Sequence, residues 1–397
     1  MERVVKTLSG ALAERDDALR ALAVAVLARE HVVFLGPTGT AKSFMVRGFA
    51  RALGGLSYFH TLLNPTSPPE ALLGPMDLAA YEQGEYRHRT AGMLPEAELA
   101  FVDEVFKGNW AILNLLLPLM EERVYHNGGT PQPCPLISLV GASNETPREE
   151  GLEAVWDRFL LRVQVDYVQD RAAFRRLLAA PPSLDGVPQV LSREELREEQ
   201  EAAARVEIPG VILDRVVVLK DELARLGITV SDRRWVKAIH GQPGRASVLQ
   251  AFTFLDGRTS VTTDDLEALV WVCWQDPSQI PDVMGVVYGV ANPTRQAVLE
   301  AKEAAYEAYS RAAAEADRLE QEARQARETG DAGNARQLNA QASNVVLEAL
   351  GEIRERLQKL EELAEREGAS TRTRELLDQA IEQARGWQAE LMRRMGV

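Results

Sequence analysis

The sequence is poor in the residues from which disulfide frameworks and zinc sites are built. Only two of its 397 residues are cysteines, Cys134 and Cys273, and neither belongs to a C-x-x-C pair. The five histidines are scattered, and none stands in an H-E-x-x-H motif. A disulfide scaffold, a zinc knuckle and a zinc protease centre are therefore not expected.

Long apolar runs and an excess of positive charge are also missing. No apolar stretch approaches the roughly 18 residues that a membrane-spanning helix needs, and the first residues, MERVVKTLSGALAERDD, are charged with only short apolar runs. The chain has 45 basic and 59 acidic residues, a formal net charge of −14, which disfavours a phosphate backbone as partner. The sequence predicts a soluble cytoplasmic protein without a membrane span, for which nucleic acid is an unfavoured partner.

Three zones of different composition follow one another along the chain. Residues 1–180 alternate helical patterns with short apolar runs, namely VVFLG, LAFVD and LISLVGAS, with weaker strand candidates in YFHTLL and LLRVQVDY. Buried strands separated by helices are typical of a parallel sheet that is covered on both faces. The first zone is therefore predicted to be an α/β domain.

The second and third zones are predicted to be helical. Residues 181–290 open with the proline-rich joint AAPPSLDGVP, and Ser192 with Glu195 forms a capping box before a helical run. Residues 291–397 are rich in Ala, Glu, Arg, Gln and Leu, with apolar stripes that step by three and four residues. Breaks at Gly330, Gly333 and Gly368 predict three antiparallel helices that pack on one another rather than an intermolecular coiled coil.

The stretch GPTGTAKS has the pattern of a phosphate-binding loop between the strand candidate VVFL and a helical run. In such a loop, backbone N–H groups face the phosphates, a lysine reaches the β- and γ-phosphate oxygens, and a hydroxyl ligates Mg²⁺. Ser43 is therefore also a metal-ligand candidate. The candidates for nucleotide binding are Gly36, Pro37, Thr38, Gly39, Thr40, Ala41, Lys42 and Ser43.

Ala41 departs from the usual pattern G-x-x-x-x-G-K-[ST], in which glycine precedes the lysine. It lies where the next helix is expected to begin, and helical backbone angles suit alanine at least as well as glycine. We therefore expect a helical backbone at Ala41 and an intact binding loop.

Polar residues follow two further strand candidates. Asp103 and Glu104 end the run LAFVDE, and Asn144 follows LISLVGAS. A P-loop NTPase needs one acid to hold Mg²⁺ and often a second to activate water, so Asp103 is predicted to bind the metal and Glu104 to orient or deprotonate the attacking water. Asn144 could hydrogen-bond the water or the γ-phosphate, although a simple turn-forming asparagine is the alternative.

With these strand ends, the sequence resembles the MoxR family of AAA+ ATPases, and most closely its RavA group (regulatory ATPase variant). The resemblance covers about residues 1–275 and includes the alanine before the P-loop lysine. It implies a P-loop AAA+ nucleotide-binding core with a parallel sheet (1–180), an all-α lid (181–290) and a C-terminal helical bundle (291–397), with ATP and Mg²⁺ as ligands. The matching stretches are GPTGTAKS, GMLPEAELAFVDEVFKGNWAILNLLLPLMEERVYHNG, SLVGASNETP, LEAVWDRFLLRVQVDY and VSDRRW.

The resemblance also implies residue roles. Lys42 and Ser43 match the Walker A pair, Asp103 and Glu104 match Walker B, and Asn144 matches sensor 1. Arg158, in WDRF, matches an arginine finger that reaches the nucleotide of the neighbouring subunit, where a guanidinium neutralises phosphoryl charge.

Each arginine assignment has an alternative. For Arg158 the alternatives are Arg162 as the finger, or a plain salt bridge with Asp157 or a nearby acid. Arg233, in SDRRW, matches sensor 2 and is expected to touch the γ-phosphate of its own chain, with Arg234 as its rival.

Two segments are predicted to be β-hairpins. The resemblance implies a hairpin inserted near the second helix, which DLAAYEQGEYRHRTAG fits with a turn at Gln83-Gly84. VYHNGGTPQPCPLISL is expected to turn at Asn127-Gly128. In a ring both would face the central pore and could grip a client, and ordinary surface hairpins are the alternative.

The resemblance implies a homo-oligomeric ring, expected to be a hexamer, that hydrolyses ATP to remodel or activate a client protein. It also implies a co-factor protein with a von Willebrand A domain, and it leaves the client unidentified. No strand-patterned insert follows Pro293, a departure from better-known RavA chains. Two other functions stay open: a AAA+ motor or loader acting on DNA, which the weakly basic hairpins disfavour, and a nucleotide-locked scaffold, which Glu104 disfavours.

Overall fold

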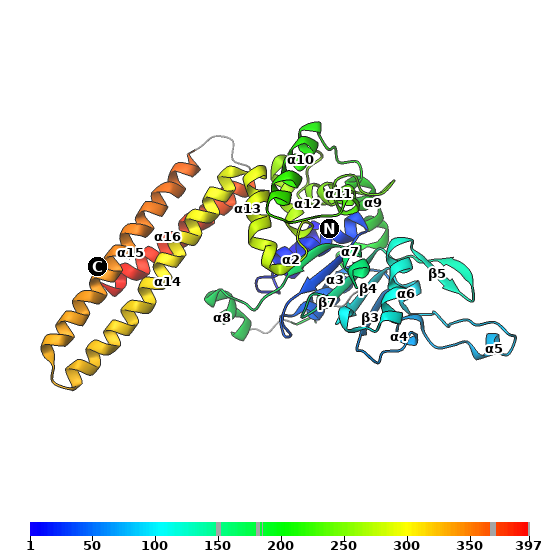
Figure 1. The fold of residues 1–397 in the computed structure, drawn as a ribbon, viewed down its shortest axis with the longest axis horizontal. Coiled ribbons are helices and arrows are strands. Elements are labelled where there is room, and N and C mark those ends of the chain that lie inside the picture. Colours follow the sequence, from blue (N-terminus) through cyan, green and yellow to red (C-terminus); the bar gives the residue numbers. More distant parts are fainter. Residues whose placement is uncertain (148–151, 180–182, 185, 366–370, 396–397) are drawn as a thin grey trace. The chain divides into compact units, whose positions relative to one another are not determined.

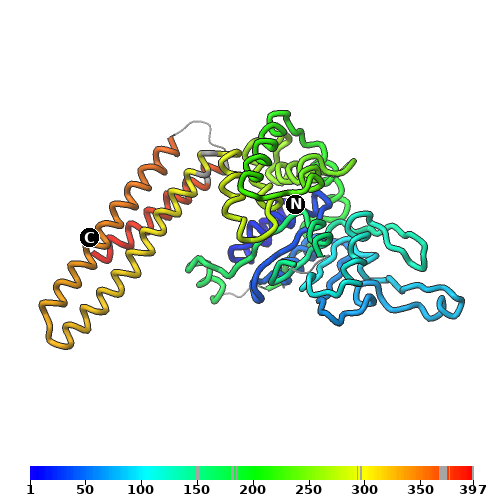
Figure 2. Tube along the Cα trace, in the orientation of Figure 1, coloured from blue at the N-terminus to red at the C-terminus, as the bar shows by residue number. Residues whose placement is uncertain are grey.

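The computed structural model describes residues 1–147, 152–179, 183–184, 186–365 and 371–395 (Figure 1). The chain divides into two compact units, Met1–Val287 and Tyr288–Val397. The predicted core and lid therefore lie together in the first unit, and the predicted C-terminal domain forms the second. Figure 2 follows the chain through both units in order.

A five-stranded parallel sheet forms the centre of the first unit. Its strands, in spatial order, are β3 (Tyr58–Leu62), β4 (Leu99–Asp103), β7 (Ser138–Ser143), β1 (His31–Leu35) and β8 (Phe159–Gln164). Strands β1 and β7 are buried along their whole length, as expected of strands covered by helices on both faces. Because all five strands are parallel, the carboxyl ends of β4, β7 and β1 lie next to one another at one edge of the sheet.

Helices cover the sheet and connect its strands. The longest buried run belongs to α2, which packs against β1, β7 and β8. The helices are α1 (Glu2–Ser9), α2 (Asp16–Ala28), α3 (Lys42–Ala52), α4 (Glu70–Leu73), α5 (Leu78–Tyr81), α6 (Trp110–Glu121), α7 (Glu153–Arg158) and α8 (Arg171–Ala179). A two-residue pairing of β2 (Leu53–Gly54) with β9 (Leu191–Ser192) joins the core to the helices that follow.

The lid consists of helices, as predicted. Ser192 and Glu195 form the expected capping box, in which the Glu195 amide donates to the Ser192 hydroxyl over 3.2 Å. The run after Thr262 is also capped but is a 3₁₀ helix. The lid elements are α9 (Arg193–Ala203), α10 (Gly210–Arg225), α11 (Asp232–Ile239), α12 (Val248–Leu255), the 3₁₀ helix η3 (Thr263–Trp271) and α13 (Ile280–Ala291).

Three long helices make up the second unit: α14 (Pro293–Glu328), α15 (Ala332–Ala364) and α16 (Thr371–Arg394). They share one apolar core, to which α14 contributes mainly alanines and α15 the predicted stripe that includes Val346, Ile353 and Leu360. Gly330 lies in the turn between α14 and α15 with φ of 82°, whereas Gly333 lies inside α15. Gly368 lies outside the described residues. The predicted packing of three helices on one another is confirmed.

The two predicted hairpins differ in outcome. β5 (Val124–Asn127) pairs antiparallel with β6 (Thr130–Pro133) as predicted, but the positive-φ residues at the turn are Gly128 and Gly129. The first predicted hairpin forms only in part: Met76 and His88 make a single antiparallel bridge and Gly84 lies in the turn with φ of 80°, but α5 occupies the first arm in place of a strand. Asp77 accepts a hydrogen bond from the Ala79 amide and so starts a helical turn where a strand was expected.

Candidate functional site

The predicted phosphate-binding loop connects β1 to α3. The Gly36 amide donates to the Ser143 carbonyl of β7 over 3.0 Å, which ties the loop to the neighbouring strand. A Cβ atom at Gly36 would lie 2.0 Å from the Val165 carbonyl oxygen, so only glycine fits there. Gly39 has φ of 84°, in the left-handed region that favours glycine. Both glycines of the motif are thus required by the backbone.

Ala41 does not have the helical backbone expected from the sequence. Its φ of 65° and ψ of 20° lie in the left-handed region, and α3 begins only at Lys42. The expectation is wrong because the chain turns sharply before it enters the helix, and a residue without a side chain turns there most easily. A left-handed conformation costs roughly 1–2 kcal/mol for an alanine, which explains why the usual motif has glycine at this position.

Lys42 is folded back over its own loop. Its Nζ donates to the carbonyl oxygens of Gly36, over 2.7 Å, and Pro37, over 2.8 Å. Burial lowers the pKa of Lys42 below that of an ordinary lysine, although the carboxylates of Asp103 and Glu104 act in the opposite direction. The ammonium group is thus held by neutral carbonyls, in a position from which it can bind an anion in the loop.

The two Walker B candidates lie next to the start of α3. The Ser43 hydroxyl donates to Oδ2 of Asp103 over 2.8 Å, and Oδ1 of Asp103 accepts from the Glu104 amide over 3.1 Å. Glu104 has φ of 53°, and its carboxylate lies 3.2 Å from Nζ of Lys107. A hydroxyl and a carboxylate at this spacing are hard oxygen donors that fit Mg²⁺.

Asn144 is exposed and follows the last residue of β7. β7 lies between β4 and β1, so its carboxyl end lies between the Walker B acids and the loop. The structure therefore brings Lys42, Ser43, Asp103, Glu104 and Asn144 to one edge of the sheet, as the sequence predicted.

A buried arginine and a small cavity that were not predicted from the sequence lie beside the loop. Arg15 Nε donates to the Thr40 carbonyl over 3.0 Å, and its Nη2 donates to the Asp166 carbonyl over 2.6 Å. Beside it is a cavity of about 170 Å³ at the end of β8 and the start of α2. No local motif marks these residues, because they come from the start of α2 and the segment after β8. The cavity is lined by Glu14, Arg15, Asp17, Ala18, Gln164, Val165, Asp166, Tyr167 and Gln169.

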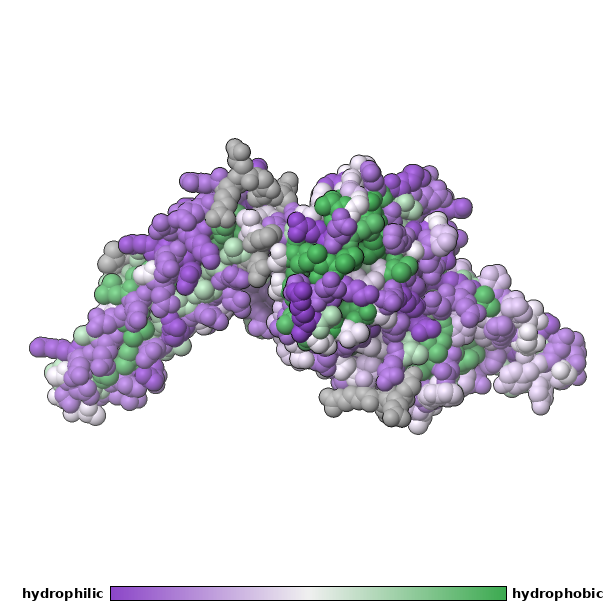
Figure 3. Space-filling view, turned by 45° about the horizontal axis from the view of Figure 1, so that its top comes forward, coloured by the Kyte–Doolittle hydropathy of each residue, from purple (hydrophilic) through white to green (hydrophobic). Residues whose placement is uncertain are grey.

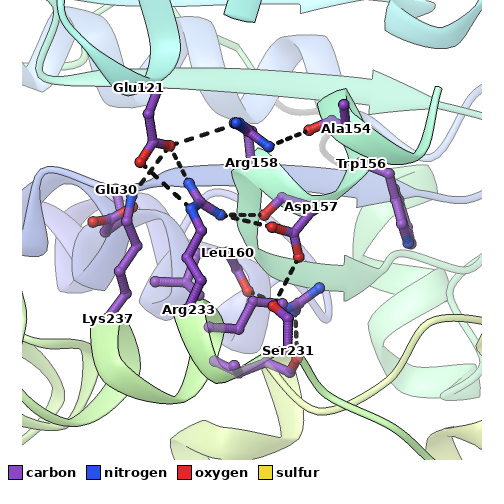
Figure 4. A network of polar contacts seen from close by, with 12 residues as sticks. Glu30, Glu121, Ala154, Trp156, Asp157, Arg158, Leu160, Ser231, Arg233 and Lys237 are labelled. Carbon is purple, nitrogen blue, oxygen red and sulfur yellow. Dashed lines mark hydrogen bonds and ion pairs between the residues drawn. The ribbon is translucent and has the colours of Figure 1, made fainter. Parts of the chain in front are cut away.

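Arg158, the predicted arginine finger, is the last residue of α7. Its Nη1 donates to the Ala154 carbonyl over 3.3 Å, and its Nε lies 3.7 Å from Oε2 of Glu121, the last residue of α6 (Figure 4). The carboxylate that it faces is thus Glu121 and not Asp157. Because Arg158 precedes β8, it lies at the amino end of the sheet, opposite the phosphate-binding loop.

Arg233 does not lie where the sequence placed it. Its Nη1 donates to the carbonyl and the carboxylate of Asp157, both over 2.9 Å, and its Nη2 binds Glu121 (Figure 4). One turn further along α11, Lys237 lies 3.1 Å from Glu30, which directly precedes β1. α11 therefore packs at the amino end of the sheet, and the length of β1, about 16 Å, separates this end from the phosphate-binding loop. Arg233 is not placed to touch the γ-phosphate of its own chain, so that expectation is wrong.

The alternatives to these two arginines are fully buried. Arg162 donates to the Trp274 carbonyl over 2.5 Å and to Gln275 over 2.7 Å, and its guanidinium lies 4.0 Å from the ring centroid of Trp156. Arg234 donates to the Leu160 carbonyl over 3.0 Å and to the carbonyl of Val272. Neither guanidinium can reach a neighbouring subunit or a nucleotide, so both arginines have structural roles.

Family models match most of the first unit. The model described as "MoxR domain in the MoxR-vWA-beta-propeller ternary systems" matches residues 1–202, and the AAA lid domain model matches residues 211–287. The second unit lies outside both matches.

Several curated proteins are similar to this chain. An uncharacterized protein of Methanocaldococcus jannaschii is 35% identical over 304 residues, which span 76% of this chain and 77% of that protein. Chaperone MoxR1 of Mycobacterium tuberculosis is 29% identical over 55% of this chain and 58% of its own length. Protein MoxR of Methylorubrum extorquens is 29% identical over 45% of this chain and 53% of its own length.

A solved structure supports the fold. The crystal structure of a proposed ATPase from Cytophaga hutchinsonii aligns with a TM-score of 0.56 and 17% identity, over 72% of this chain and 92% of that chain. Within the residues described here, every helix is too short or too polar to cross a bilayer. From its family matches and its relatives, the chain belongs to the MoxR family of AAA ATPases, a membership that implies ATP binding.

Proposed function

We propose that this chain is a ring-forming ATPase that hydrolyses ATP to remodel or activate a partner protein. The observation that supports the proposal most is the hydrogen bond from Ser43 to Asp103, which places the Walker A helix and the Walker B strand together at the carboxyl edge of the sheet. Lys42 and Glu104 lie at the same edge, and Asn144 directly follows the strand between them, β7. P-loop NTPases use this set of groups for phosphoryl transfer.

Each group at this edge has a defined task in the proposed reaction. Lys42 exchanges its carbonyl partners for oxygens of the triphosphate, and backbone N–H groups of the loop bind the remaining charge. Ser43 and Asp103 would hold Mg²⁺, which supplies charge neutralisation on the phosphates when bound. Glu104 orients the attacking water and accepts its proton, and Asn144 positions the water or the γ-phosphate.

The groups that complete the reaction come from the neighbouring subunit. Arg158 and Arg233 lie together at the amino end of the sheet, away from the loop of their own chain. A neighbour related by the rotation of a ring would present its nucleotide to this face, since a head-to-tail contact joins two different faces of one chain. We therefore place both arginines in trans, and a hexamer is the expected ring.

An exposed apolar surface on the first unit is available for such contacts. Helix α10 carries Val211, Val217 and Val218, which are 56%, 60% and 45% exposed. Figure 3 shows hydrophobic surface gathered on the first unit. Contiguous exposed apolar patches mark protein interaction sites, and we propose that this surface takes part in such a contact.

The partners proposed for the ring come from its relatives. The matching family model describes systems with a von Willebrand A protein, and one relative is named a chaperone. We propose a co-factor with a von Willebrand A domain, an unidentified protein client, and the cytoplasm as the compartment. Membership of the RavA group within the MoxR family stays a prediction.

ATP turnover measured against protein concentration tests this function. Wild-type turnover per subunit should rise with concentration as rings form, and Arg158→Ala should abolish the rise. Glu104→Gln should bind ATP with little turnover, because the amide cannot accept a proton. The control is Arg197→Ala, which removes an exposed arginine paired with Glu201 on α9 and should leave turnover unchanged. A turnover per subunit that is independent of concentration would contradict catalysis at a subunit interface.

A further inference from the structure

Three cationic side chains converge on a single oxygen of Glu121. Nε of Arg158 lies 3.7 Å from Oε2, Nζ of Lys237 lies 3.7 Å from the same atom, and Nη2 of Arg233 binds it directly (Figure 4). The cations come from α7 and α11, and the carboxylate ends α6. One carboxylate therefore joins the core to the lid at the face that we assign to the neighbouring nucleotide.

Two of these cations are held by other acids, so they do not depend on Glu121 for their positions. Arg233 makes two contacts of 2.9 Å with Asp157, whose carboxylate also accepts from Ser231 over 3.1 Å. Lys237 lies 3.1 Å from the buried Glu30. Removing the charge of Glu121 would therefore leave Arg233 and Lys237 in place.

Arg158, in contrast, is incompletely bound. Its Nε is buried and donates no hydrogen bond, since Glu121 is beyond hydrogen-bond distance. A buried guanidinium N–H without an acceptor costs free energy. The arrangement thus has room for an acceptor that approaches Arg158 more closely than Glu121 does.

The donors at the site suit a phosphate better than a carboxylate. Asp157 and Glu30 already pair with Arg233 and Lys237, and Glu121 offers a single oxygen to all three cations, whereas a terminal phosphate offers three acceptor oxygens. Glu121 is 32% exposed, so its side chain can leave the cluster towards solvent.

We propose that the carboxylate of Glu121 stands where the terminal phosphate of the neighbouring subunit's ATP binds. It keeps Arg158 and Arg233 paired in the free subunit, and it must withdraw before they can contact that phosphate. Arg158 and Arg233 could then act on the neighbouring subunit only when that subunit has ATP bound. This inference rests on the proposed function, in which both arginines act in trans.

A mixture of two inactive variants tests the proposal. A donor subunit with Lys42→Ala lacks its own nucleotide but keeps its arginines, and an acceptor subunit with Arg158→Ala keeps its nucleotide but offers no finger. ATP turnover is measured while the donor is titrated into a fixed amount of acceptor. The donor is prepared with native Glu121, with Glu121→Gln, and with Glu122→Gln as the matched control, because Glu122 is exposed and follows directly.

The Glu121→Gln donor should reach half-maximal turnover at a concentration at least threefold lower than the native donor, with a maximal rate within twofold. The Glu122→Gln donor should match the native one. A merely structural role for Glu121 would instead lower the maximal rate without making the donor more effective. If Glu121→Gln does not fold, Glu121→Asp is used instead, because it keeps the charge on a shorter side chain. The Glu121→Asp donor should also lower the half-maximal concentration, but by a smaller factor.

The outcomes separate this proposal from the function on which it rests. If the native donor and acceptor together show no turnover, the arginines do not act in trans, and both proposals are overturned. If that pair is active but neither Glu121 variant lowers the half-maximal concentration, only the role of Glu121 is overturned.

Discussion

The hydroxyl of Ser43 and the carboxylate of Asp103 meet across 2.8 Å, although 60 positions separate them in the sequence. The contact joins the first turn of α3 to the end of β4, two strands away from β1 in the sheet. It fixes the spacing of the two oxygen ligands that we assign to Mg²⁺.

Asp103→Asn removes the negative charge of this side chain but keeps its shape, so its effects on stability and on ATP turnover should differ. The amide oxygen can still accept the hydrogen bond from Ser43, so the free energy of unfolding should change by less than about 1 kcal/mol. A neutral amide is a weaker ligand for Mg²⁺ than a carboxylate, and ATP turnover should fall by roughly 100-fold or more.

Steady-state turnover at several Mg²⁺ concentrations and urea unfolding check the two halves of this prediction. Asp221→Asn, an exposed change on α10, serves as the control for both measurements. If Asp103→Asn had the same turnover as the wild type, the assignment of Asp103 as a metal ligand would be contradicted.

Ala41→Gly tests the left-handed backbone before Lys42. Glycine adopts φ of 65° without strain, so the substitution should leave the free energy of unfolding unchanged or raise it by up to about 1 kcal/mol. A helical Ala41 would give the opposite sign, a loss of about 1 kcal/mol. Urea unfolding of the two proteins decides between them, and Ala50→Gly inside α3 should show that helical loss.

His31 should make stability depend on pH. Its Nδ1 accepts from the Leu139 amide over 2.8 Å, and its Nε2 lies 2.9 Å from the Met120 carbonyl. Burial, followed by the charge of Arg123, lowers the pKa of His31 well below 6.5. Below about pH 6.5 the imidazole of His31 is therefore protonated in the unfolded chain but stays neutral in the folded chain. The free energy of unfolding is highest above this pH and decreases as the pH falls below it.

The expected loss from His31 is at most about 1.4 kcal/mol for each pH unit below 6.5. Urea unfolding at pH 7.0, 6.0 and 5.5 measures this slope. His31→Gln should lower stability at pH 7.0 but reduce the slope, whereas a substitution at the exposed His126 should keep it. An equal slope in the His31 variant and the wild type would show that other groups carry the pH dependence.

The parts of the site that the sequence predicted are those set by local pattern and strand order. GPTGTAKS and Asn144 each follow a buried strand, Asp103 ends one, and parallel strands bring their ends to one edge. The side of the core on which the lid packs depends on contacts between residues far apart in the chain, which a local sequence pattern does not reveal. Arg233 was therefore expected beside the γ-phosphate, whereas in the structure it pairs with Glu121. Arg15 was missed for the same reason, since its partners are carbonyls far away in the chain.

Arg158 and Arg162 are four residues apart, and their substitutions should have opposite consequences. Arg162 is fully buried and donates to the carbonyls of Trp274 and Trp156, so Arg162→Met leaves buried acceptors unpaired and should cost roughly 3 kcal/mol of stability. Arg158 is 27% exposed and only loosely paired with Glu121, so Arg158→Ala should cost less than about 1 kcal/mol.

The substitutions of the two arginines should also have different effects on ATP turnover. Arg158→Ala should remove the concentration-dependent turnover while the subunit stays folded, because the lost group acts on the neighbour's nucleotide. Arg162→Met should lower turnover only in proportion to the fraction unfolded, which urea unfolding under the same conditions determines. A folded, assembled Arg162→Met protein without turnover would reverse the assignment, since a buried structural arginine has no contact through which to act on the nucleotide.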